Sequence, residues 1–171
     1  MDVNNFGIDP SINLVKNFQD NYHKTLRSNC YVLGVSKTAV SAKNSMCGIK
    51  NPASSGKVLV MEQLVITTDS ESNVVIKPES ASGGTTGLNG SNKFLGGSAG
   101  VGIGETNEYD STLFPTYGKL SGVNGSGSGR VPSLYTFTSP YIVPENYTFY
   151  LVCLTLNVTM VATFFWSEED V

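Results

Sequence analysis

Apolar and polar residues alternate with a period of two over much of the chain from residue 29 onward. The alternation is clear in residues 31–35 and returns in residues 57–68, a β-branched and aliphatic run that is the best strand in the first half. A period of two sends successive side chains to opposite faces of a sheet, which is the pattern of a half-buried strand. The chain from residue 29 is therefore predicted to be β-rich.

Further strands are predicted where similar runs are bounded by turn-forming residues. The turns include residues 51–56 (NPASSG) and 69–73 (DSESN), while Pro78 and Pro140 are expected to end strands. The remaining strands are placed at residues 38–42, 73–78, 130–138, 141–143, 147–156 and 158–166. About eight short strands with Gly- and Pro-containing turns predict an all-β fold, an antiparallel β-sandwich of jelly-roll type.

Residues 1–28 do not share the strand pattern, and we interpret them as an extended N-terminal arm beside a sandwich domain of residues 29–171. Residues 9–11 (DPS) could cap a short helix. The arm carries apolar side chains that need a surface to cover them, either on its own domain or on a partner. These candidate anchoring residues are Phe6, Ile8, Leu14, Val15 and Phe18.

Residues 79–129 form an excursion rich in Gly and Ser. A structureless loop of this length is uncommon inside a compact domain. We therefore expect a partly ordered segment that packs on a neighbour or folds over a sheet face. Residues 96–104 contain spacings like those of a dinucleotide-binding loop, but no helix is predicted after them, so a structural loop of closely packed backbone is the better interpretation.

Charge excludes some partners. Charged residues make up 15% of the chain and the net charge is −3, with no cluster of Lys and Arg, so no nucleic-acid partner is expected. The apolar run of residues 147–166 is interrupted by Thr and Asn, so it predicts strands and no membrane partner. The N-terminus lacks the apolar stretch of a signal peptide, which indicates synthesis in a cytoplasm without secretion.

Little in the sequence points to catalysis or to a cofactor. The one histidine, His23, lies in polar surroundings of the arm, so no Ser-His-Asp or Cys-His set can be built. Three cysteines without short spacing argue against a disulfide scaffold and a zinc site, and Cys153 is interpreted as a small buried hydrophobe. Asp69, Glu71 and the terminal residues 167–171 are interpreted as solvated turns and an exposed acidic tail. No catalytic residue, metal or cofactor is expected.

Two stretches of the chain carry a family resemblance. Residues 51–57 (NPASSGK), followed by the aliphatic residues 58–64, resemble small virion proteins of tailed bacteriophages, in which NPxxSGK opens a strand of a jelly-roll head-fibre, decoration or spike domain. Residues 139–146 (SPYIVPEN) and the closing run of residues 160–169 resemble the end of the same proteins, with Glu145 in place of the usual Gly. The resemblance covers residues 48–170.

The resemblance implies a non-enzymatic virion protein on the outer surface of a phage particle, acting as a capsid decoration, cement or spike subunit. Its implied partners are further copies of itself in a homotrimer and the major capsid protein or another virion protein. The alternative is a receptor- or glycan-binding tip of a phage fibre, which would use loop tyrosines such as Tyr109 and Tyr117 on a host surface glycan. An enzyme such as a glycan depolymerase is disfavoured, because no pair of carboxylates stands out.

Overall fold

The computed structural model describes residues 29–39, 42–80, 84–93, 95–109, 118–123 and 132–171. Within these ranges the chain forms eleven β-strands. In chain order they are β1 (Cys30–Thr38), β2 (Asn44–Asn51), β3 (Lys57–Thr68), β4 (Ser72–Ser80), β5 (Gly84–Asn89), β6 (Ser91–Asn92), β7 (Ile103–Tyr109), β8 (Gly118–Val123), β9 (Ser133–Val143), β10 (Tyr147–Cys153) and β11 (Thr159–Asp170).

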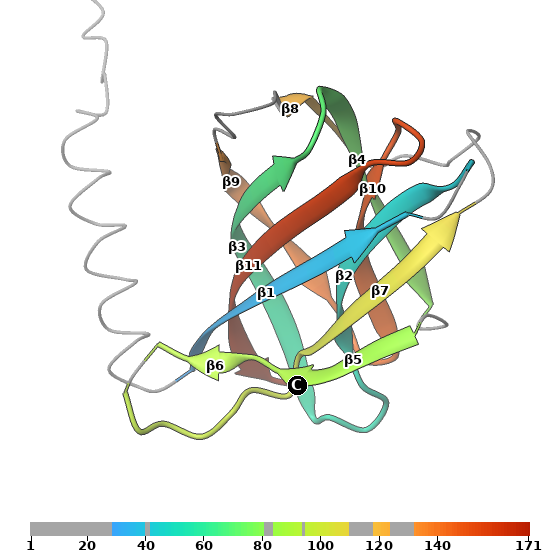
Figure 1. Cartoon of the computed structure of the whole chain (residues 1–171). Coiled ribbons are helices and arrows are strands. Elements are labelled where there is room, and N and C mark those ends of the chain that lie inside the picture. The colour runs from blue at the N-terminus through green and yellow to red at the C-terminus, as the bar shows by residue number, and fades with distance from the viewer. Residues whose placement is uncertain (1–28, 40–41, 81–83, 94, 110–117, 124–131) are drawn as a thin grey trace, which may run out of the picture.

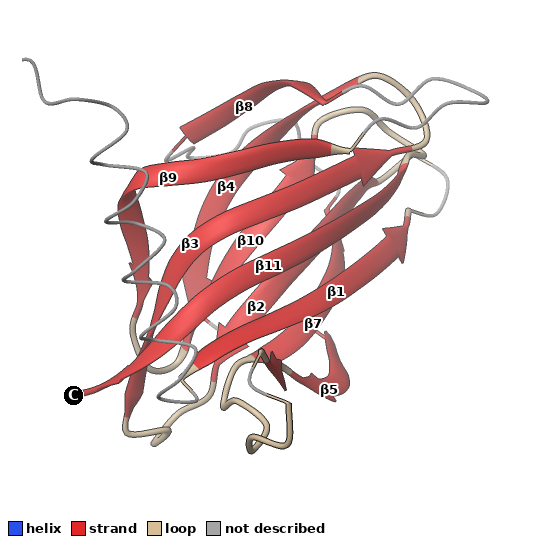
Figure 2. Ribbon diagram, turned by 90° about the vertical axis from the view of Figure 1, so that its left-hand side faces the viewer, coloured by secondary structure: helices blue, strands red, loops and turns tan. Residues whose placement is uncertain are grey.

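The strands form two antiparallel sheets that pack face to face (Figure 2). Sheet A has the order β6-β1-β11-β3-β9, and sheet B has the order β5-β7-β2-β10-β4-β8. Without β5, β6 and β7, the other eight strands have the order of a jelly roll, with β1, β11, β3, β9 facing β2, β10, β4, β8. Strands consecutive in this set lie in opposite sheets, except β4 and β8, which pair with each other in sheet B. The predicted all-β jelly-roll sandwich is confirmed.

The three additional strands come from the part of the glycine-rich excursion between β4 and β8, and β8 itself also lies within residues 79–129. Strands β5 and β7 extend sheet B beyond β2, and β6 extends sheet A beyond β1. Both β5 and β6 lie at the lower end of the sandwich in Figure 1. The described part of the excursion therefore packs on its own chain, and it brings the strand number above the eight predicted.

The two prolines expected to end strands do not end them. Strand β9 runs through Pro140, and it can do so because β9 is the edge strand of sheet A and a missing N–H need not break a ladder there. Strand β4 continues past Pro78, which is in register with Phe149 of β10. Pro140 lies in the irregular stretch of β9 between Thr136 and Tyr141, which has no register pairs with β3, so its missing N–H breaks no ladder.

The core lies between the sheets and is built from alternate residues of each strand. Strand β11 shows the alternation well, since its even-numbered residues from Met160 to Trp166 are buried and the odd ones between them are half-buried. Each fully buried aliphatic or aromatic side chain contributes about 1.5–3 kcal/mol relative to exposure. The largest core side chains are Trp166, Phe164, Leu59, Met61, Leu64, Ile66, Ile49, Leu151, Ile76 and Met160.

A second apolar cluster covers the opposite face of sheet B. It consists of Met46, Val75, Tyr150 and Val152, with Leu154 packed against it. The centre of sheet B is therefore buried on both faces. This accounts for the continuous apolar sequence of β10, in which no polar residue alternates between Phe149 and Cys153.

Candidate functional site

The candidate anchoring residues of the arm, Phe6, Ile8, Leu14, Val15 and Phe18, lie outside the described residues, as do His23 and Tyr117. Tyr109 ends β7. The structure therefore does not test whether these predicted site residues lie together. The site described below consists of residues from other parts of the chain.

The two sequence stretches that carry the phage resemblance meet in space. Asn51 donates through its side-chain amide to the carbonyl oxygens of Lys57 (2.8 Å) and Val143 (3.0 Å). The Ser55 hydroxyl donates to Asn51 Oδ1 over 2.7 Å, and Glu145 Oε1 accepts from the backbone N–H of Gly56. The turn between β2 and β3 is thus bonded to the turn between β9 and β10.

The turn between β9 and β10 accommodates Glu145 at the position where the pattern that this sequence resembles has glycine. The left-handed residue of the β9–β10 turn is Asn146, with φ of 62°, and Asn is one of the residues that tolerate this conformation. The Asn146 N–H donates to the Asn51 carbonyl over 2.9 Å. A glycine at position 145 is not needed for the turn, so the position is free for a carboxylate that binds the neighbouring turn.

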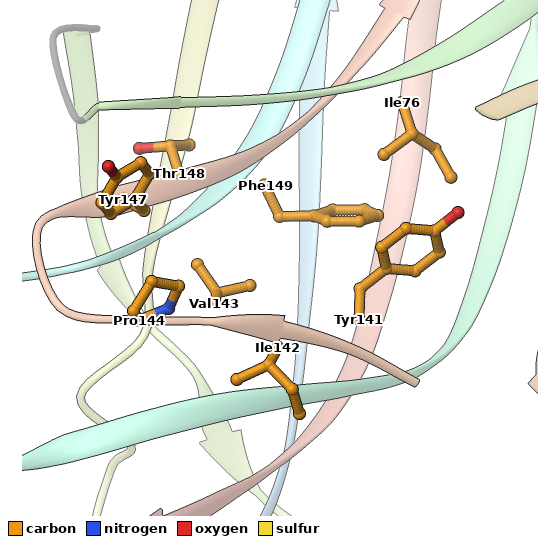
Figure 3. Close-up of a pocket in the computed structure, with 8 residues that line it drawn as sticks. All are labelled: Ile76, Tyr141, Ile142, Val143, Pro144, Tyr147, Thr148 and Phe149. Carbon is orange, nitrogen blue, oxygen red and sulfur yellow. The ribbon is translucent and has the colours of Figure 1, made fainter. Parts of the chain in front are cut away.

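A pocket of about 180 Å³ lies beside this pair of turns, where β9 crosses from sheet A to β10 in sheet B (Figure 3). Its lining is mostly apolar and consists of Ile76, Tyr141, Ile142, Val143, Pro144, Tyr147, Thr148 and Phe149. Ile142 is 55% exposed and Tyr147 is 45% exposed, while Val143 and Phe149 are buried. An apolar cavity of about 150 Å³ is large enough for benzene, so the pocket could hold one ring or one branched aliphatic group.

Aromatic rings form one wall of the pocket. The Tyr141 and Phe149 rings lie next to each other in Figure 3, with centroids 5.4 Å apart. Phe137 packs edge-on against Tyr141 at 4.9 Å, and Phe149 packs edge-on against Phe164 at 6.4 Å. Edge-to-face contacts of this kind fix ring orientation, so the wall connects the pocket to the core through a rigid row of rings.

The glycine-rich loop binds a carboxylate of its own chain. Glu168 Oε1 accepts from the backbone N–H groups of Val101 (2.8 Å) and Gly102 (3.2 Å), and from Trp166 Nε1 (3.1 Å). Successive backbone N–H groups form an anion-binding concavity, and here the anion is internal. These hydrogen bonds to Glu168 are the physical reason why residues 96–104 form a structural loop.

Two glycines of the glycine-rich excursion pack so closely on the Trp166 ring that no larger residue fits in their place without movement. A Cβ atom added to Gly102 would lie 2.8 Å from the Trp166 ring, and one added to Gly90 would lie 2.3 Å from it. Tyr31 stacks on Trp166 with centroids 5.9 Å apart. The described excursion therefore seals one end of the core against its own tryptophan.

The acidic terminal residues are not all exposed, as the sequence had suggested. Strand β11 continues to Asp170, and Glu168 is only 5% exposed because the glycine-rich loop covers it. Glu169 and Asp170 are exposed. Asp69 accepts from the Thr159 N–H over 3.0 Å and so closes the turn at the other end of β3.

Sequence reasoning missed a buried carboxylate in sheet B. Glu105 on β7 is fully buried, and its Oε2 accepts from the hydroxyls of Tyr150 (2.6 Å) and Thr148 (2.8 Å) on β10. Lys50 Nζ lies 3.4 Å from the other oxygen, Oε1. Nothing near Glu105 in the sequence signals this group, because its partners come from strands β2 and β10, more than forty residues away.

The three cysteines are free thiols and all are buried, as was expected of Cys153. Burial raises the pKa of Cys47 to about 12, with a smaller contribution from the nearby Cys153. In the described part of the chain, no three His, Cys, Asp or Glu side chains lie close enough to hold a metal ion. No helix within the described ranges is long and apolar enough to cross a membrane.

Comparisons of the chain with protein-family models, with curated proteins and with solved structures gave no match. The functional argument therefore depends on the fold, on the paired turns and on the surfaces of the sandwich.

Proposed function

We propose that this chain is a non-enzymatic structural protein of a virus particle of the tailed-phage type. It decorates or stabilises the outside of the capsid as a cement, decoration or spike subunit. It assembles as a homotrimer and binds the major capsid protein or another virion protein. It is made in the host cytoplasm and takes its place on the particle without secretion.

The observation that carries this proposal is the contact between the two turns. The resemblance rested on residues 51–57 and 139–146, which are distant in sequence. The side chains of Asn51 and Glu145 bind across these turns within one hydrogen-bonded group. Motifs that resemble one family and also form one structural unit support a common origin better than two isolated matches do. The jelly-roll strand order supports the same reading.

In the proposed mechanism the arm anchors the subunit and the sandwich projects from the particle. The apolar arm residues, among them Leu14 and Phe18, would be buried on the capsid or on a neighbouring subunit. Hydroxyl and amide groups hydrate the surface, and this keeps closely spaced copies soluble. With 15% charged residues, the chain has few charges to repel between neighbouring copies.

Particle incorporation tests the proposal. Particles assembled with the full chain should contain it in a fixed stoichiometry, measured by quantitative mass spectrometry. The double variant Leu14→Asp, Phe18→Asp should be lost from particles, because charge on the arm opposes burial. A matched control, Asn4→Asp with Asn21→Asp, adds two charges at polar arm positions and should be retained. Particles that lack the wild-type chain would contradict the proposal, and full retention of the first variant would contradict the anchor.

The alternative function, a receptor- or glycan-binding tip, is favoured by the exposed aromatic rim of the pocket. Tyr147 is 45% exposed beside Pro144, and sugar rings pack on exposed aromatic faces. A glycan array should then show saturable binding that Tyr147→Ala abolishes and Tyr147→Phe preserves. Tyr109→Ala and Tyr117→Ala test the loop tyrosines in the same assay. Absence of binding on the array would leave the pocket without this role.

A further inference from the structure

The outer face of sheet A, which faces the viewer in Figure 2, is a broad surface built from paired rows of residues. Strand register aligns Val32, Phe165, Gln63 and Thr136 in one row across β1, β11, β3 and β9. The next row is Gly34, Thr163, Val65 and Leu134, and the third is Ser36, Val161 and Thr67. Each row holds only uncharged side chains. We define these three rows as the row face.

Apolar side chains on the row face and further along β9 are accessible to solvent. Leu134 is 64% exposed on β9, and Ile142, further along the same strand and in register with Val60, is 55% exposed. Val32, Val65, Val161 and Phe165 are half-buried. The centre of sheet B differs, since the apolar cluster of Met46, Val75, Tyr150 and Val152 on its outer face is buried. A patch of this kind on one sheet of a soluble domain marks an interaction surface.

Among the described residues, charged groups near this face lie beside the first row or beyond it. Lys57 pairs with Asp170 at the far end of β11, and Lys93 lies over the Phe165 ring at 5.8 Å beside β6. Glu62 lies at the irregularity of β3, next to Ser167 and beyond the first row. The row face is therefore an uncharged centre with charged groups toward one end, which is the general layout of a protein–protein interface.

We propose that the row face is where copies of this chain associate with one another. In a cyclic oligomer the same face of every subunit approaches the axis, so like charges on it would meet and repel. A face without charge avoids this penalty. The proposal rests on the homotrimer of the proposed function and specifies which surface builds it.

The size of the face fits this occupant. Four strands spaced about 4.8 Å apart and rising about 3.3 Å per residue give the whole outer face of sheet A roughly 600 Å² over the eleven pairs of β11 and β3, and the row face is about half of it. Stable interfaces use about 800 Å² of accessible surface on each partner, and protruding side chains add area to a flat patch. A second copy can therefore be held by the whole outer face with the row face as its uncharged part, whereas a small ligand would leave most of this surface exposed.

Light scattering on the purified full chain tests the proposal. The wild type should have a mass near three times 18.3 kDa. Leu134→Lys places a charge in the middle row, at the β9 edge of the face. Because the side chain is exposed, the change should leave the sandwich folded while reducing the mass to that of one chain. Leu95→Lys is the matched control, because Leu95 is 94% exposed on the glycine-rich loop, and it should keep the wild-type mass.

Tryptophan fluorescence checks that each variant is folded, since Trp166 is buried in the core. If Leu134→Lys scatters as the wild type does, another surface builds the assembly and the proposal is wrong. A monomeric wild type at all concentrations would also overturn it, and would assign the face to another occupant such as residues 1–28. Particle incorporation is a separate readout, so a chain that assembles through this face but is absent from particles would contradict the proposed function alone.

Discussion

The Tyr150 hydroxyl donates a 2.6 Å hydrogen bond to the Glu105 carboxylate, and both residues are fully buried. This contact joins β10 at the centre of sheet B to β7, a strand of the inserted excursion. A carboxylate taken out of water is costly unless hydrogen bonds replace its hydration. The bond therefore fastens the insertion to the jelly roll.

Replacing Tyr150 with Phe should destabilise the fold by about 1.5–3 kcal/mol, because it removes a hydrogen bond to a buried charged group and keeps the ring. The free energy of unfolding in urea measures the effect. Tyr147→Phe is the control, since that side chain is 45% exposed and its removal of one hydroxyl should change stability by less than about 0.5 kcal/mol. Equal effects from the two variants would show that Glu105 does not depend on Tyr150.

Gly102→Ala should cost about 1–3 kcal/mol, because its Cβ would lie 2.8 Å from the Trp166 ring and the loop must move away. The emission of Trp166, the one tryptophan of the chain, should shift to longer wavelength as the seal opens. The control is Gly34→Ala, where the nearest atom would be 3.7 Å away in an exposed strand position. An unchanged spectrum in Gly102→Ala would mean that the loop does not shield the tryptophan.

Glu145→Gly restores the residue usual in the resembling family, and here it should destabilise the fold by about 1–2 kcal/mol. The change removes the acceptor for the Gly56 N–H and adds backbone freedom in the turn. Thermal unfolding followed by circular dichroism gives the difference. Glu169→Gly changes an exposed glutamate near the end of β11 and separates loss of charge from loss of this contact. A neutral or stabilising effect of Glu145→Gly would show that the Glu145 carboxylate does not stabilise the paired turns.

Alkaline pH should weaken the fold through Cys47. Burial raises the pKa of this thiol from 9.0 to about 12, so the folded chain keeps the proton at a pH where the unfolded chain has released it. The contribution is unchanged below about pH 8 and is lost as pH rises from about 9 toward 12, by at most about 1.4 kcal/mol per pH unit. Burial raises the pKa of Cys153 as well, which acts in the same direction.

Urea unfolding at pH 7.5, 9.5 and 10.5 measures this slope. Cys47→Ala lowers stability at every pH through its cavity, but its decline with pH should be shallower than that of the wild type. The comparison of slopes isolates the thiol from lysines and tyrosines that titrate in the same range. Identical slopes would show that Cys47 ionises as readily in the folded chain as in the unfolded one.

The strands that sequence alone predicted have either a period of two or, like β10, a continuous apolar run. Strands β3 and β11 show this, because their residues alternate between buried and half-buried positions and the period of two is visible. Strand β2 was not predicted. Seven of its eight residues are buried, and a strand enclosed on both sides has no polar alternation. Strand β10 is also buried on both faces, but its continuous apolar run marked it as a strand, whereas β2 (NSMCGIKN) has neither a period of two nor an apolar run.

The candidate site was predictable only in part, for a similar reason. The turn at residues 51–56 was recognised from its own composition. Its bond to Glu145 was not, because the partner is about ninety residues away and a carboxylate in a turn is ordinarily solvated. Glu168 was misjudged in the same way, as an acidic residue near the end of the chain. Long-range pairing of a carboxylate with backbone N–H groups leaves no periodic signal.

Strand β11 lies in the middle of sheet A, between β1 and β3, although it follows the other described strands in sequence. During synthesis β1 therefore waits without this partner until residues 159–170 have left the ribosome. Sheet A cannot close before then, and Trp166 and Glu168 are not yet available to the glycine-rich loop. Folding of this domain should accordingly follow synthesis of β11, and a chain cut short within β11 should have an exposed strand edge with which other chains can pair.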